Sequence, residues 1–294
     1  MAIVSLPLIV GTDGSDASLL AVDWAADAAA LRGSELRIVY ASLWERYEGA
    51  RPSPGAGCPS ERIMAEHILA SAEQRALLRR PEVKVLGEVV AEEAEEALLR
   101  LSRHAAAVVV GSRGRGEFAT QLLGSVGLTV AAKATCPIVV VRGGGGAAGE
   151  IPWIALGVGP VGGSGDAARE FAFSEANSRG WGVLAVHAWR RPHGVGPDWD
   201  GWQDSAAHKD HAAAAERLDQ ALVRPTADFP GVPVKRVMPE GRARPALLEA
   251  AQGTALVVVG ARRRRNPLGL QLGPVNHAVL HHAPCPVAVV PDHD

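Results

Sequence analysis

The sequence of 294 residues contains only three cysteines, and no two of them form a CxxC pair. An odd number of cysteines without that spacing argues against a framework of disulfide bonds. We therefore expect a reducing, cytoplasmic environment. Cys136 and Cys285 each precede a proline at the entry to an expected strand, and we interpret both as small buried apolar residues.

An excess of either charge is also missing, because 30 basic residues face 32 acidic ones and the net charge is −2. Such a chain has no overall positive field with which to hold a nucleic acid or an anionic membrane. No apolar run approaches the roughly 18 residues that cross a bilayer. Hydrophobic residues nevertheless make up 47% of the chain, so we expect a folded globular protein.

The chain contains an internal repeat. Gly111 and Gly260 each end a run of three valines, and Cys136 and Cys285 each begin a final apolar run. The members of both pairs are 149 residues apart. We infer two tandem copies of one domain, joined by glycine-rich sequence typical of a flexible linker. The expected order is domain 1, linker and domain 2, at residues 1–142, 143–150 and 151–294.

Within the first copy, short apolar runs alternate with segments whose apolar residues recur every three or four positions. This alternation predicts an α/β domain with a five-stranded parallel sheet and helices on both of its faces. The expected strands lie at residues 8–10, 36–40, 83–86, 107–110 and 138–141.

The first expected helix is capped by Ser15 or Asp16 and ends at Gly33. The later helices are expected at residues 60–80, 92–104 and 124–134. The predicted inward faces contain Ala17, Leu20, Ala21, Trp24, Ala28 and Leu31 in the first helix, and Ile63, Ile68, Leu69, Ala72 and Leu77 in the second.

Glycine-rich loops follow the first and fourth strands, at residues 11–15 (GTDGS) and 111–116 (GSRGRG). Gly124 and Ser125 then open a helix. Parallel sheets bind ligands beyond the carboxyl ends of their strands, where these loops would lie. Glycines let backbone amides approach phosphate oxygens, and a helix N-terminus attracts anions.

Charged side chains accompany these loops. Arg113 and Arg115 could add charge-assisted hydrogen bonds to a phosphate. Asp13 is acidic and suits a ribose hydroxyl or a metal-bound water better. On the residues alone, phosphate binding and ordinary tight turns both remain open interpretations.

The spacing Gly111-x2-Gly114-x9-Gly124-Ser125 resembles the nucleotide motif G-x2-G-x9-G-[S/T] of the universal stress protein family. The segments VGTDGS and CPIVVV of the first copy are similar to that family too. The resemblance covers nearly the whole chain, as two tandem copies. It implies Rossmann-like domains of the kind that bind ATP.

The resemblance also implies the position of the nucleotide. Asp13 would lie near the ribose, and the backbone of Tyr40 and Ala41 near the adenine. The implied nucleotide-binding residues are Gly11, Thr12, Asp13, Ala41, Gly111, Ser112, Arg113, Gly114, Arg115, Gly116, Glu117, Gly124, Ser125 and Val126.

The second copy departs from this motif at three positions. Arg263 and Pro274 replace the second glycine and the serine, and Gly159 or Pro160 stands where the first copy has its aspartate. A proline offers neither an amide hydrogen nor a hydroxyl, so we expect a degenerate ATP motif. Arg262 to Arg265 could hold an anion in another way, although a solvated basic loop is the simpler interpretation.

Signatures of nucleotide-handling enzymes and hydrolases are missing, because the chain contains no G-x4-G-K-[ST], G-x-S-x-G or H-x-G-H sequence. We therefore assign no catalytic residue. The favoured hypothesis is a cytoplasmic ATP-binding stress protein whose nucleotide occupancy modulates a stress or growth regulatory role. The alternatives are an interaction module without nucleotide, and a weak ATPase or nucleotidyl-transfer enzyme of the same broad fold.

The expected ligand is ATP, with Mg²⁺ as a candidate companion ion. A homodimer and a regulatory protein partner are open, whereas nucleic acid and a membrane span are not expected. Asp204, His208 and His211 would share a helix face, but no convincing fourth ligand accompanies them. We therefore predict no metal site built from side chains of the protein.

Overall fold

The computed structural model describes residues 6–43, 58–114, 123–143, 151–159, 165–190, 200–261 and 272–292. Its side chains are described from residue 62 in the helix that begins at Cys58, and from residue 210 in the helix that begins at Asp200. For these residues the chain divides into two compact units, between Gly143 and Gly144. No helix in the described ranges combines the length and hydropathy needed to cross a bilayer.

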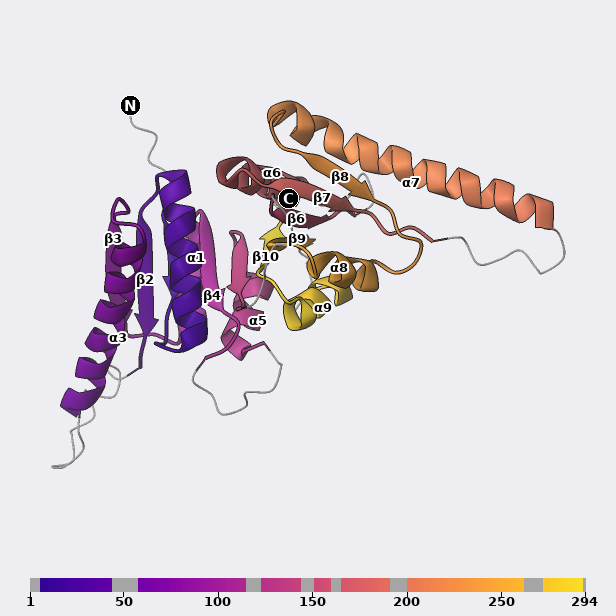
Figure 1. The fold of residues 1–294 in the computed structure, drawn as a ribbon. Helices are drawn as coiled ribbons and strands as arrows, with labels where there is room; N and C mark the ends of the chain where they lie inside the picture. Colours follow the sequence, from indigo (N-terminus) through magenta and orange to yellow (C-terminus); the bar gives the residue numbers. More distant parts are fainter. Residues whose placement is uncertain are drawn as a thin grey trace. The chain divides into compact units, whose positions relative to one another are not determined.

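The first unit alternates strands and helices as predicted (Figure 1). Its hydrogen-bonded strand order is β3-β2-β1-β4-β5, with every pair parallel. The elements are β1 (Leu8–Gly11), α1 (Asp16–Arg32), β2 (Leu36–Ala41), α3 (Cys58–Arg79), β3 (Val85–Val90), α4 (Ala94–Leu101), a 3₁₀ turn (Ser102–His104), β4 (Ala107–Gly111), α5 (Ser125–Lys133) and β5 (Ile138–Val141).

The second unit repeats this arrangement, with the parallel strand order β8-β7-β6-β9-β10. Its elements are β6 (Trp153–Gly157), α6 (Asp166–Arg179), β7 (Gly182–Val186), α7 (Asp200–Asp228), β8 (Val234–Val237), α8 (Ala243–Ala251), β9 (Leu256–Ala261), α9 (Pro274–His282) and β10 (Val287–Pro291). The α/β class and the tandem organisation are therefore confirmed.

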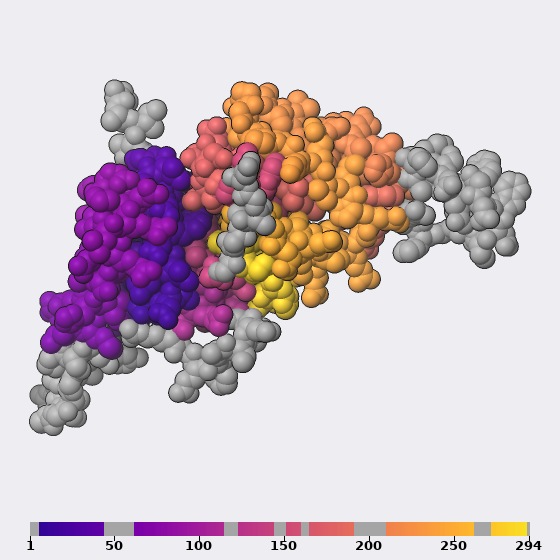
Figure 2. Space-filling model, in the orientation of Figure 1, coloured from indigo at the N-terminus to yellow at the C-terminus, as the bar shows by residue number. Residues whose placement is uncertain are grey.

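The direction in which strands are added reverses between β1 and β4. From β1 the chain proceeds outward to β2 and β3, and then returns to place β4 on the other side of β1. The loops after β1 and β4 consequently diverge and leave a crevice at the carboxyl ends of these strands. Helices α1 and α3 pack together, as do α4 and α5. In the space-filling view, α1 and α3 form most of the visible face of the first unit (Figure 2).

The ends of α1 follow the sequence signals, whereas its buried face follows them only in part. Ser15 caps the helix, and Gly33 ends it in the left-handed conformation at φ 59°. Ala21 and Ala28 are buried as predicted, but Leu20 and Leu31 are 37% and 44% exposed. The residues that the helix buries are mostly small: Ser18, Ala21, Val22, Ala25, Ala26, Ala28 and Ala29. The prediction for the two leucines was wrong because apolar residues occur all round this helix, so periodicity could not select the buried side.

The same preference for small residues appears in α3. Ile68 and Ala72 are buried as predicted, whereas Ile63 and Leu77 were predicted to face inward but are exposed. Ala65 and Ala76 are buried as well. Strand β3 also runs farther than predicted, to Val90 instead of residue 86, because it pairs with β2 along its whole length.

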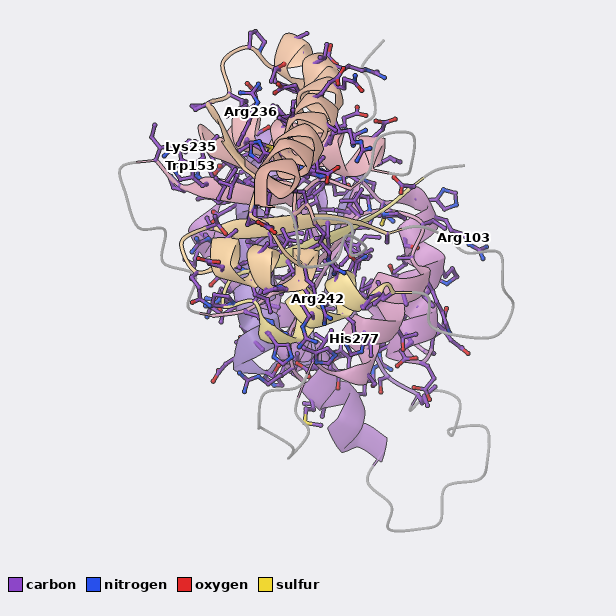
Figure 3. All side chains as sticks on the ribbon, turned by 90° about the vertical axis from the view of Figure 1, so that its right-hand side faces the viewer. Arg103, Trp153, Lys235, Arg236, Arg242 and His277 are labelled. Atoms are coloured by element: carbon purple, nitrogen blue, oxygen red, sulfur yellow. The ribbon has the colours of Figure 1, made fainter. Side chains whose placement is uncertain are left out.

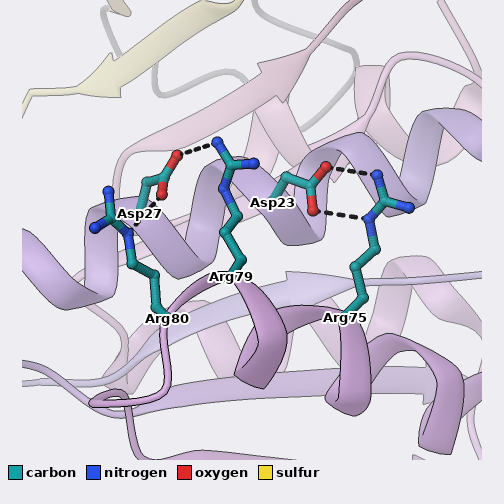
Figure 4. A network of polar contacts seen from close by, with 5 residues as sticks. All are labelled: Asp23, Asp27, Arg75, Arg79 and Arg80. Carbon is teal, nitrogen blue, oxygen red and sulfur yellow. Dashed lines mark hydrogen bonds and ion pairs between the residues drawn. The ribbon is translucent and has the colours of Figure 1, made fainter.

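Ion pairs join α1 to α3 along their exposed edge (Figure 4). Arg75 donates two hydrogen bonds to Asp23, with N···O distances of 2.7 and 2.6 Å. Arg79 and Arg80 donate to Asp27 at 2.6 and 2.7 Å. Burial alone would raise the pKa of Asp27, but the hydrogen bonds from the two arginines outweigh it and the pKa lies below its ordinary value.

In the second unit, the Trp153 ring occupies the space that a side chain at Gly182 would need. A Cβ atom at Gly182 would lie 2.5 Å from the Trp153 ring, which extends over this position from the neighbouring strand. The Lys235 ammonium lies 4.2 Å from the centre of the same ring (Figure 3). This cation–π contact links β6 to β8 over β7.

Candidate functional site

Hydrogen bonds within the loop after β1 hold the Asp13 carboxylate at the start of α1. Its Oδ1 atom accepts from the Ser15 amide at 3.0 Å and from the Ser15 hydroxyl at 2.6 Å. Thr12 and Ser18 share a hydrogen bond between their hydroxyls at 3.1 Å, and the Asp13 amide donates to the Ser18 hydroxyl. The carboxylate position is therefore set by the chain itself.

The loop after β4 returns to the sheet at Gly124, the N-cap of α5. The Gly124 amide donates to the Ser112 carbonyl at 3.1 Å, which docks the helix start on the end of β4. The first turn of α5 then presents Ser125 and Val126, and no side chain caps it. The amides of a first helical turn have no partner within the helix, and they favour anions.

A side chain would meet different surroundings at each of the three motif glycines. A Cβ atom at Gly111 would lie 2.7 Å from the carbonyl carbon of Ala17, so α1 could not pack on β4. One at Gly114 would lie 2.7 Å from Asp13 Oδ2. At Gly124 the nearest atom would be 4.0 Å away, so packing within the protein does not require glycine there. The motif predicts phosphate approach at all three glycines, but packing within the protein also explains Gly111 and Gly114.

A cavity of about 530 Å³ lies between these loops. Ten predicted residues line it: Gly11, Thr12, Asp13, Ala41, Gly111, Arg113, Gly114, Gly124, Ser125 and Val126. Ser112 is buried behind the lining, where its carbonyl accepts from Gly124. Arg115, Gly116 and Glu117 lie outside the described residues.

Seven further residues line the cavity and were not predicted: Ser18, Val39, Ala94, Leu98, Val110, Leu123 and Gly127. Most are small or aliphatic, so no chemical signal distinguishes them from core residues in the sequence. The walls from β2 and α4 are apolar, whereas the loops after β1 and β4 contribute carboxylate, guanidinium and hydroxyl groups. The cavity thus has an apolar part and a polar part.

Comparison with known proteins identifies the family. The family model described as "Universal stress protein family" matches residues 7–142 and 158–291, one match for each unit. The chain belongs to the universal stress protein family.

Relatives of this universal stress protein match it over nearly their full length. Universal stress protein Rv2005c of Mycobacterium tuberculosis is 31% identical, with 96% of each chain covered. Universal stress protein Rv2623 of the same organism is 31% identical, with 97% of this chain and 96% of the relative covered. The solved structure of a universal stress protein from Archaeoglobus fulgidus has a TM-score of 0.64 at 17% identity, covering 97% and 98%, and supports the fold.

The second unit of this universal stress protein keeps only part of the motif. Gly273 is the N-cap of α9, and Pro274 occupies the first helical position, where it lacks an amide hydrogen. Gly159, one of the two residues that stand in place of the aspartate, is exposed in the loop after β6. Pro160 and Arg262 to Arg265 lie outside the described residues, so the interpretation of that basic run stays a prediction.

The two described cysteines of this universal stress protein are buried. Burial raises the pKa of the Cys136 thiol to about 12, and Cys285 is buried as well. Both therefore fit the predicted role of small apolar residues. No group of three or more metal-ligating side chains occurs among the described residues. The His211 ring packs edge-on against Trp189, with 5.4 Å between the ring centroids. The side chains of Asp204 and His208 lie outside the described residues.

Proposed function

We propose that the first unit binds ATP and that occupancy of this site serves a regulatory role in the stress response. The cavity lies at the point where strand order reverses, and its volume of about 530 Å³ falls within the roughly 300–1,000 Å³ of small-molecule sites. The observation that carries the proposal is Gly124, a helix N-cap whose missing side chain leaves open space beside the cavity.

The phosphates are assigned to the polar part of the cavity. The amides of Ser125 and Val126 start α5, whose dipole favours negative charge at this end. The Ser125 hydroxyl is exposed and can donate to a phosphate oxygen, and the Arg113 guanidinium lines the same cavity. Arg115, Gly116 and Glu117 complete the proposed set from the sequence.

The nucleoside is assigned to the apolar part. Val39, Ala94 and Leu98 offer surface that a purine ring can cover. The backbone of Ala41 at the end of β2 is the proposed neighbour of the base. Asp13 lines the cavity and can accept a hydrogen bond from a ribose hydroxyl.

Asp13 also fits a second role, because Mg²⁺ on a nucleotide typically takes phosphate oxygens, waters and one or two carboxylates. When bound, the ion would neutralise phosphate charge. The charge of Asp13 therefore suits either ribose binding or a water on Mg²⁺, and titrations with and without the ion distinguish the two.

A regulatory role is proposed in preference to catalysis, because the chain lacks the sequence signatures of nucleotide hydrolases and transferases. In this role, bound nucleotide would order the loops after β1 and β4 and change what a partner protein recognises. A homodimer is part of the proposal, as is a cytoplasmic location, with which the buried thiols of Cys136 and Cys285 are compatible.

Native mass spectrometry of the full, untagged chain, purified without added nucleotide, tests the assignment. The expected result is one ATP or ADP per chain, and isothermal titration should then give a stoichiometry near one. A stoichiometry near two would show that the second unit is misinterpreted. Absence of binding for ATP and ADP would favour the interaction module, and turnover of bound ATP would favour the weak ATPase.

A further inference from the structure

The two units provide an internal comparison at the helix that follows the fourth strand. Helices α5 and α9 are both nine residues long and both begin after a glycine. The backbone angles of that glycine are φ −63° and ψ 155° at Gly124, and φ −60° and ψ 160° at Gly273. The helix starts therefore have the same local geometry, and differences between their side chains can be compared directly.

One such difference lies three residues after the N-cap. The first unit has Gly127, which lines the cavity. The second unit has Asn276 at the matching position, 149 residues farther along. Asn276 is only 7% exposed, and its Nδ2 atom donates to the carbonyl oxygen of Gly260 at 2.9 Å. Gly260 matches Gly111, which also lines the cavity of the first unit.

The end of the fourth strand differs in a related way. In the first unit the Ser112 carbonyl accepts from Gly124 and so docks α5. The matching Ala261 carbonyl accepts from the Asp292 amide at 3.1 Å, because β9 and β10 pair one residue farther. In the second unit the Asn276 side chain thus supplies a bond between α9 and the end of β9.

We propose that the Asn276 side chain closes the nucleotide site of the second unit, an inference that rests on the proposed function of the first. The amide lies against the carbonyl of Gly260, whose counterpart Gly111 lines the cavity of the first unit, and displacement would cost this part-buried hydrogen bond. Pro274 alone removes one amide, while those of the next two residues still point out of the helix start. Asn276 is therefore the decisive substitution.

Transfer of this side chain to the first unit is the direct test. Gly127→Asn should reach the Gly111 carbonyl and weaken ATP binding in isothermal titration by about 100-fold or more. Gly127→Ala is the matched comparison, because it adds a Cβ, 3.1 Å from Leu123 and 3.8 Å from Val110, without the amide. Gly127→Asn should bind ATP at least about tenfold more weakly than Gly127→Ala. Gly127→Asn binding ATP within about tenfold of the wild type would overturn the proposal.

A second measurement requires neither ATP nor a folded Gly127→Asn variant. The crystal structure of the full chain with Asn276→Gly should show a new cavity beside Gly260 and Gly273, with α9 in place. Collapse of α9 onto the strand ends, or a site no more open than in the wild type, would contradict closure by Asn276. If the wild type binds no ATP at all, the proposed function fails while this structural test still decides the inference.

Discussion

Replacing Gly124 by tryptophan should abolish nucleotide binding and leave the fold intact. The backbone angles at Gly124 suit any L-residue, and a Cβ there meets nothing closer than the Ser112 carbonyl at 4.0 Å. A nonpolar residue at an N-cap costs roughly 0.5–1 kcal/mol relative to glycine. The melting temperature should therefore fall by only about 1–4 °C.

The loss of affinity follows from the contacts that the indole would block. A phosphate oxygen must come to about 2.9 Å from an amide nitrogen to form a hydrogen bond. If the side chain blocks the amides of Ser125 and Val126, two bonds to a charged group are lost, at about 1.5–3 kcal/mol each. The sum of about 3–6 kcal/mol corresponds to a decrease in affinity of about 10²- to 10⁴-fold.

The second unit supplies the matched control, because Gly273 has the same backbone conformation and no atom of the described residues lies within 4 Å of its Cβ position. Gly273→Trp should lower the melting temperature by a similar amount and leave ATP affinity unchanged. Isothermal titration and thermal unfolding of both variants make the comparison. Unchanged affinity in Gly124→Trp, or an equal loss in Gly273→Trp, would refute the phosphate assignment.

Three further outcomes are expected. Asp13→Ala should weaken ATP binding by about five- to a hundredfold, through loss of about 1–3 kcal/mol, and an unaltered dissociation constant in titration would count against a ligand contact. Gly111→Ala should destabilise the protein in urea unfolding by about 1–3 kcal/mol, because its Cβ meets the Ala17 backbone. Gly260→Ala should be nearly neutral, because its Cβ would lie 3.6 Å from the nearest described atoms. Equal effects of the two variants would contradict the packing argument. The ion pairs of Asp27 lower its folded pKa, so the stability that they add is complete above the unfolded pKa of 3.8 and is lost as pH falls through the folded pKa. The difference in unfolding free energy between wild type and Asp27→Asn should therefore shrink from pH 7 to pH 3. A constant difference would show that these pairs contribute nothing.

The repeat made the architecture predictable from the sequence. Once two copies were recognised, the alternation of apolar runs and helical segments indicated the sheet, and Ser15 and Gly33 marked the ends of α1. The side of each helix that packs on the sheet was harder to infer. Close packing selects alanines that periodicity cannot rank against neighbouring leucines such as Leu20 and Leu31.

Loop chemistry was predictable in the candidate site, whereas its walls were not. Glycines and charged residues near Gly111 and Gly124 form a local motif that can be read along the chain. Ala94 and Leu98 reach the cavity from α4 only because the fold brings that helix beside β1, and small apolar side chains give no warning of it. The role of Asn276 could not be predicted for a similar reason, because it depends on a hydrogen bond to a carbonyl sixteen residues earlier.

The close contact between Gly111 and Ala17 makes one wall of the cavity stiffer than the others. Main chain meets main chain there, so this wall cannot yield through a change of rotamer. Leu98 and Leu123 lie opposite glycines at distances that their flexible ends can adjust, at Gly11 and Gly127. A bulkier ligand would therefore be accommodated by movement of these leucines, and the space between β4 and α1 would stay fixed in size.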